Sequence, residues 1–158
     1  MTMPARLLAL FATAALAVPA VASADPAVTQ QDSPCSADLG GAATLPFGRS
    51  LPLACQDSRW QAVTAPGDPS DRWVSFGPPI ALHGEGLRNP NLSSGVWTAT
   101  PLDPQAQCAA TQHVVVSAGV VGPPVTAKGE PGQPFTFQVL PSLFDITMTG
   151  HCLWTRTG

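Results

Sequence analysis

The sequence predicts an all-β protein, an antiparallel sandwich of about seven strands held together by two disulfides. Three observations lead to this fold class. Eighteen prolines spread along 158 residues leave little room for a long helix. Short runs rich in Val, Thr, Trp and Phe alternate with turn sequences such as TAPGDPSD and GEGLRNPNLSSG. The four cysteines form an even set, which is typical of a disulfide framework in an exported chain.

The first residues have the features of a secretory signal peptide. Arg6 precedes an apolar run over residues 7–18, and the small residues Ala22 and Ala24 form an A-x-A cleavage site. We therefore expect residues 1–24 to be removed. Residues 25–34 should then form a flexible N-terminus and residues 35–158 a single β-sandwich domain. Since no cysteine stands at the cleavage site, we expect a released protein without stable membrane insertion.

Strands in the first half of the chain are expected where apolar residues alternate between turn signals. The sequence SADLGGAATLPFGRSLPL, which ends just before Cys55, reads as a loop with room for one edge strand. TAPGDPSD and FGPP then separate three short runs that are rich in Trp, Val and Phe. These predicted strands are residues 59–65, 72–76 and 80–83.

In the second half of the chain, apolar and polar residues alternate more clearly. Phe135, Phe137 and Val139 share one face of a strand, and in the last segment Cys152 and Trp154 continue the apolar face that includes Ile146 and Met148. The C-terminus is thus predicted to be a strand buried on one side. The strands expected here are residues 96–100, 111–118, 135–139 and 144–154.

A short helix is the alternative for one stretch of the second half. Asp103 followed by Pro104 is typical of an N-cap and first helical position, so a turn or two of helix over residues 105–111 is compatible with the sequence. The periodicity does not decide between this helix and a simple turn.

The cysteines allow three connectivities. We expect Cys35 to pair with Cys55, which ties the irregular N-terminal region to itself, and Cys108 to pair with Cys152, which fastens the last strand to an earlier one. No two of the four have the C-x-x-C spacing of a zinc site or a redox motif.

A competing pairing follows from a resemblance. The order Cys55, Trp73, Cys108 resembles that of immunoglobulin domains, whose two sheets are joined by a disulfide next to a buried tryptophan. This chain has Ala106 where that family has a tyrosine, two residues before the second cysteine. The resemblance therefore implies an immunoglobulin-like architecture and no function.

Composition carries a second resemblance. The leader ends in ASADPA, and the chain that follows is rich in Ala, Pro and Gly and has Lys128 as its single lysine. These features are similar to those of small exported proteins of mycobacteria and related actinobacteria. The resemblance implies a location in the cell envelope or outside the cell, and it transfers no functional residue.

Net charge excludes two classes of partner. The chain carries a formal charge of −3 at neutral pH, and one of its seven basic residues, Arg6, would leave with the leader. Nucleic acids and anionic membrane surfaces attract clusters of basic residues, which this sequence lacks. We expect a protein, glycan or lipid-like partner instead.

Two features are candidates for ligand binding. The loop GEGLRNPNLSSG is long for a hairpin connection, and long ordered loops on a rigid β scaffold often carry binding residues. Two tryptophans that follow arginines are the ones expected to be exposed, where they could stack against a sugar or lipid ligand. The candidate residues are Glu85, Arg88, Asn89, Asn91, Trp60 and Trp73.

Histidines suggest an alternative function as a small copper- or zinc-binding protein. His83 and Glu85 would project on the same face of a strand because they are two residues apart. His113 and His151 would lie on neighbouring strands if Cys108 pairs with Cys152. The candidate metal ligands are therefore His83, Glu85, His113 and His151.

Catalytic motifs are not found in the sequence. It contains no G-x-S-x-G nucleophile elbow, and cysteines paired in disulfides cannot act as nucleophiles. We therefore interpret the chain as a secreted, non-enzymatic binding or interaction module of the cell envelope or extracellular space, without a cofactor. The metal-binding protein is the alternative.

Overall fold

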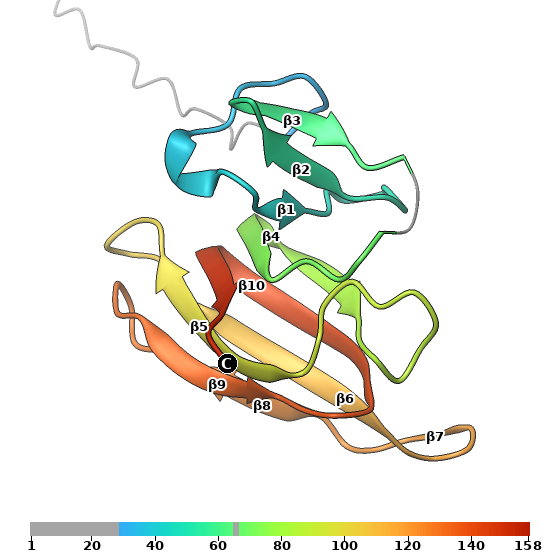
Figure 1. The fold of residues 1–158 in the computed structure, drawn as a ribbon. Coiled ribbons are helices and arrows are strands. Elements are labelled where there is room, and N and C mark those ends of the chain that lie inside the picture. Colours follow the sequence, from blue (N-terminus) through green and yellow to red (C-terminus); the bar gives the residue numbers. More distant parts are fainter. Residues whose placement is uncertain (1–28, 65–66) are drawn as a thin grey trace, which may run out of the picture.

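The computed structural model describes residues 29–64 and 67–158 (Figure 1). Regular structure in this part of the chain is β apart from one short 3-10 helix, η1 (Ala37–Leu39), so the predicted all-β class is confirmed. The predicted signal peptide and residues 25–28 lie outside the described residues. No described helix has the length and apolar character needed to cross a membrane. The strands are β1 (Ala43–Thr44), β2 (Leu53–Gln56), β3 (Arg59–Ala62), β4 (Arg72–His83), β5 (Gly95–Pro101), β6 (Ala109–Ser117), β7 (Val120–Val121), β8 (Val125–Lys128), β9 (Phe135–Val139) and β10 (Leu143–Arg156).

Two of the predicted strands, residues 72–76 and 80–83, are one continuous strand, β4. The FGPP sequence between them was expected to form a turn, but it lies inside the strand as a bulge. Gly77 adopts a φ of +104°, and the register of β4 against β10 shifts between Met148 and Gly150. A bulge absorbs one extra residue and bends the strand, so β4 continues past its prolines.

The central strand is β10, which forks the sheet. One of its edges pairs with β4 along most of its length. Its other edge pairs with β6 from Leu143 to Thr149 and with β5 from Cys152 to Arg156. The fork lies at Gly150, whose φ is +96° and whose missing Cβ would collide with the carbonyl oxygen of Gln107. This position therefore requires glycine.

The sheet is mixed, in the order β3-β2-β1-β4-β10-β5-β9, and β6 branches from β10 together with β7 and β8. β1 pairs antiparallel with β2 but parallel with β4, through Ala43 and Trp73. The expected all-antiparallel sandwich of about seven strands is therefore only partly confirmed. Four short strands, β1, β2, β7 and β8, raise the strand number, and of these the sequence had indicated one at most, in the region before Cys55.

Alternate residues of β4 and β10 pack into two hydrophobic cores on opposite faces of the sheet. The larger core lies inside the fork and contains Trp73 and Trp154, whereas Val74 belongs to the second core, formed with the N-terminal strands. We call residues 35–62, which carry η1 and β1 to β3, the N-terminal layer. It covers part of the outer face of β4 and β10, as the upper part of Figure 1 shows.

Both disulfides have the expected connectivity, so the alternative pairing of Cys55 with Cys108 is wrong. Cys35 bonds to Cys55 and closes the N-terminal layer on itself. Cys108 bonds to Cys152 and joins the start of β6 to β10 close to the fork. Disulfides form and persist in oxidising compartments, so two of them indicate that the chain folds in such an environment.

Two irregular segments bear on the remaining predictions. Residues 29–34, part of the expected flexible N-terminus, lie along β3, where Asp32 donates its backbone N–H to the carbonyl of Trp60. Residues 105–111 form no helix. The Asp103 carboxylate does accept the backbone N–H of Gln105 at 2.9 Å, as an N-cap would, but β6 begins at Ala109 and ends the turn.

Candidate functional site

A groove of about 700 Å³ lies between the N-terminal layer and the long loop of residues 84–94 that follows β4. Ala81 and His83, near the end of β4, contribute to its floor, and the loop between β1 and β2 supplies a wall. The volume falls within the range of about 300–1,000 Å³ that is typical of ligand sites. The groove therefore lies where three elements that are distant in the sequence meet.

Asn91, one of the predicted binding residues, holds the long loop against β4. Its side-chain oxygen accepts the backbone N–H of His83 at 2.8 Å, and its own N–H donates to the His83 carbonyl at 2.8 Å. Its carbonyl also accepts the N–H of Ser70 at 2.9 Å. Asn91 lines the groove, but these bonds show that it mainly positions the wall.

Glu85, another predicted binding residue, does not line the groove. It joins the start of the same loop to its end. Its carboxylate accepts the backbone N–H of Ser94 at 3.0 Å. Hydrogen bonds from the side chain and the backbone of Ser94 lower the pKa of Glu85, and partial desolvation opposes them while Arg156 adds a smaller lowering. Glu85 thus acts as a structural carboxylate.

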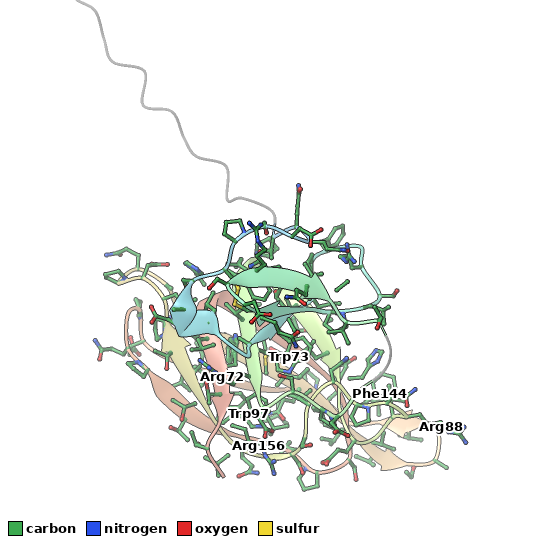
Figure 2. All side chains as sticks on the ribbon, turned by 45° about the horizontal axis from the view of Figure 1, so that its top comes forward. Arg72, Trp73, Arg88, Trp97, Phe144 and Arg156 are labelled. Carbon is green, nitrogen blue, oxygen red and sulfur yellow. A yellow bond between two sulfur atoms is a disulfide. The ribbon has the colours of Figure 1, made fainter. Side chains whose placement is uncertain are left out.

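Arg88 and Asn89 are the predicted loop residues that remain available to a ligand. Both line the groove and both are exposed. Asn89 adopts a φ of +54°, a left-handed conformation that asparagine tolerates at a turn. Figure 2 shows Arg88 at the outer margin of the molecule, where its side chain extends from the loop. Its guanidinium has no hydrogen bond or ion pair with any other described residue.

The opposite wall contains residues that sequence reasoning missed. Arg49 and Leu51 line the groove from the loop between β1 and β2, and Phe47 at the tip of that loop is 95% exposed. Like Arg88, the Arg49 side chain has no hydrogen-bonding or ionic partner among the described residues. The available signal was the sequence LPFGRSL, in which an aromatic and a basic residue flank a glycine that turns the chain with a φ of +78°.

The two tryptophans proposed as an exposed stacking platform are buried, so that prediction is wrong. Trp60 is 3% exposed and packs edge-on against Phe76 in the second core. Trp73 is 1% exposed; it lies at the base of the groove, and its indole N–H donates to the carbonyl of Ser70 at 3.1 Å. Arg72 does not hold Trp73 outward because its guanidinium is bound to the carbonyls of Asp38 and Gly40.

The proposed metal ligands do not come together. His83 and His113 both lie opposite Asp145 in the register of β4, β10 and β6, and the ring of His113 bonds to the Asp145 carboxylate at 2.7 Å. Even so, no group of three or more His, Cys, Asp or Glu residues in the described part of the chain could hold a metal ion. The expected set of three histidines with Glu85 is therefore not assembled.

His151 has a separate partner, just beyond Gly150 in β10. Its Nδ1 lies 3.0 Å from the Asp103 carboxylate, and its ring lies near Phe76, outside the groove. Desolvation is the largest influence on the pKa of Asp103 and raises it, but hydrogen bonds from Gln105, His151 and Ala106 lower that pKa below its ordinary value overall. This pair fastens the turn before β6 to β10.

Comparisons with protein families, curated proteins and solved structures found no match to this chain. The groove and its side chains are therefore the basis of the functional argument.

Proposed function

We propose that this chain is a secreted, non-enzymatic binding module on an immunoglobulin-like scaffold, and that its ligand site is the groove between the N-terminal layer and residues 84–94. The observation that carries this proposal is the presence of two arginines, Arg49 and Arg88, on elements far apart in sequence, lining one groove without described partners. Arginine without a partner is suited to bind carboxylates or phosphates through paired hydrogen bonds.

Rigidity of the walls supports the same proposal. The Cys35–Cys55 disulfide braces the N-terminal layer, and Asn91 fixes the opposite loop to β4. A preformed site loses less conformational entropy when a ligand binds. The groove therefore combines a fixed shape with free polar groups.

Export is part of the proposal and is supported by two features. The first 24 residues resemble a signal peptide, and the leader and composition are similar to those of small exported actinobacterial proteins. The two disulfides fit an oxidising location in the envelope or outside the cell. The ligand classes that fit the composition are a protein, a glycan and a lipid-like molecule.

An NMR titration of the mature chain tests the proposal. Three probes represent the ligand classes: a capped acidic peptide, a neutral oligosaccharide and decanoate. At least one should shift the amide signals of groove residues in a saturable way. Ala81→Phe, which adds bulk at an exposed position of the groove floor, should abolish that shift.

Val125→Phe is the matched control, since Val125 is also exposed on a strand but does not line the groove. It should leave the titration unchanged. The proposal fails if none of the three probes shifts groove residues, or if the shifts persist in Ala81→Phe.

A further inference from the structure

The floor of the groove contains an open strand edge. The N–H and the carbonyl of His83 both bond to Asn91, while Gly84 donates to the Phe144 carbonyl at 3.2 Å, on the side of β10. Residues of an antiparallel pair alternate between pointing their backbone groups at the partner strand and away from it. The backbone groups of His83 point away from β10, so those of Ala81, two residues earlier in β4, also point away from β10.

Ala81 is therefore positioned to receive another strand. It is exposed and lines the groove, and no loop, turn or side-chain hydrogen bond among the described residues involves its N–H or carbonyl. β1 covers this edge of β4 only at Trp73, and Asn91 covers it at His83. Pro79 has no N–H, so the open stretch is short and offers one donor at Ala81.

The charge and the apolar surface of the groove lining determine which kind of added strand fits the groove. Arg49 and Arg88 lie on opposite walls, and Asp68 is the single acidic side chain in the described lining. A guanidinium forms its strongest hydrogen bonds with a carboxylate or a phosphate. Leu51 and Val63 add apolar lining against which alternate side chains of an extended segment could pack.

We propose that the groove binds an extended, acidic peptide segment of a partner protein, which adds as a strand to the open edge of β4. The backbone of the segment bonds to the N–H and carbonyl of Ala81, and its carboxylates bind Arg49 and Arg88. This inference rests on the proposed function, because it takes the groove to be the ligand site. An oligosaccharide or a fatty acid has no alternating amide and carbonyl groups to match the strand edge.

The test measures the affinity of the mature chain for a capped nonapeptide in which Thr and Asp alternate. Ala81→Pro removes the outward N–H and leaves the bonds to β10 in place. It should weaken binding about tenfold, the effect of roughly one hydrogen bond. Ala81→Val keeps the N–H and also adds bulk at this position, so it should weaken binding less than Ala81→Pro does. A peptide that is N-methylated at its central residue tests the same pairing on the unaltered protein.

Charge is tested with the same peptide. Arg49→Ala and Arg88→Ala should each weaken binding several-fold at low salt, whereas Lys128→Ala, at an exposed site outside the groove, should not. A peptide with Lys in place of Asp should bind at least tenfold more weakly than the acidic one.

Three results overturn the inference: equal binding of the Lys peptide, unchanged binding to Ala81→Pro, or full binding of the N-methylated peptide. If the oligosaccharide or decanoate still shifts groove residues in that case, the proposed function stands and the peptide inference alone fails. If no probe reaches the groove, both fail.

Discussion

Single residues at the fork of β10 explain how the sheet divides without leaving buried polar atoms unpaired. Ser75 on β4 is fully buried and donates its hydroxyl to the carbonyl of Gly150 at 2.6 Å. The same hydroxyl accepts the indole N–H of Trp154 at 2.9 Å. One serine thus satisfies both groups, and no buried side-chain polar atom of the described residues lacks a hydrogen bond.

Ser75→Ala should destabilise the protein by about 2–3 kcal/mol, because the Trp154 N–H and the Gly150 carbonyl lose their buried partner. Urea unfolding of the mature chain, followed by tryptophan fluorescence, measures the change. Ser117→Ala, at an exposed position of β6, is the control and should change the free energy of unfolding by less than about 0.5 kcal/mol. Equal stability of the two variants would contradict the role given to Ser75.

Glu85 should make a small contribution to stability that depends on pH. The folded pKa of Glu85 lies below the ordinary value of a glutamate, so the contribution is complete above that ordinary value and is lost as the pH falls through the folded pKa. The difference in unfolding free energy between the wild type and Glu85→Gln should be constant near neutral pH and narrow in acid. Because the carboxylate is exposed, we expect a few tenths of a kcal/mol at most.

Urea unfolding at several pH values between 3 and 7 measures this difference, with Glu130→Gln as an exposed control outside the loop. A difference that stays constant down to the lowest pH would show that the Ser94 hydrogen bonds do not favour the ionised form of Glu85.

At the scale of elements, the bulge of β4 and the glycine of β10 that lies opposite it give the fold its shape. Both strands continue through a glycine with positive φ, Gly77 in β4 and Gly150 in β10. The bulge bends β4 next to Gly150, and there β10 changes partners from β6 to β5 without ending. The fork is therefore a property of one strand and not of a loop.

Gly150→Ala should destabilise the fork by more than Gly119→Ala destabilises the turn between β6 and β7. Both positions have positive φ, which costs an alanine about 1–3 kcal/mol. Only at Gly150 would the added Cβ also collide with backbone, whereas nothing lies within 4 Å of it at Gly119. Thermal unfolding of the two variants measures the difference, and an equal loss would show that the fork tolerates a side chain at Gly150.

The sequence predicted the strands in which apolar and polar residues alternate. It did not predict the strands whose formation depends on pairing with distant parts of the chain. β9 and β10 were predictable because one face of each is buried, and the last strand carries Cys152 and Trp154 inward as expected. FGPP was misread because prolines next to a glycine usually mark a turn, yet a bulge on an open strand edge also accommodates them. β1, with two residues, is too short for any alternation to show.

The candidate site was predictable only in part, for the same reason. Arg88, Asn89 and Asn91 were identified because their loop is unusually long. Arg49 was missed because its place in the groove depends on how the N-terminal layer packs against β4, a contact that no local pattern encodes. The arginines before Trp60 and Trp73 suggested exposure, but a neighbouring charge does not determine which way a ring points on a strand.

At the scale of the whole molecule, the two cores stabilise different parts of the structure. The larger core inside the fork holds β4, β5, β6, β9 and β10 together, and the second core attaches the N-terminal layer to the outer face. The groove lies at the edge of that layer. The shape of the groove therefore depends on the second core, whereas the main sheet is stabilised by the larger core.

Removing the Cys35–Cys55 disulfide should affect the groove more than the main sheet. By the loop-entropy model the 20-residue separation corresponds to about 3 kcal/mol, and the 44-residue separation of Cys108–Cys152 to about 4 kcal/mol. The double variant with serines at positions 35 and 55 should lose amide protection in β2 and β3 but keep it in β5 and β9. Hydrogen exchange followed by mass spectrometry measures both regions, and uniform loss would show that the layer is not a separate unit.

Strand addition to β4 is tested most directly by the exchange rate of the Ala81 amide hydrogen, measured by NMR with and without the acidic nonapeptide. An open strand edge in a binding groove predicts fast exchange in the free protein, and at least tenfold slower exchange at saturating peptide. The neighbouring amide of Leu82, which faces β10, should be protected in both states. An Ala81 amide that is already protected in the free protein, or one whose exchange the peptide leaves unchanged, would rule out strand addition at this edge.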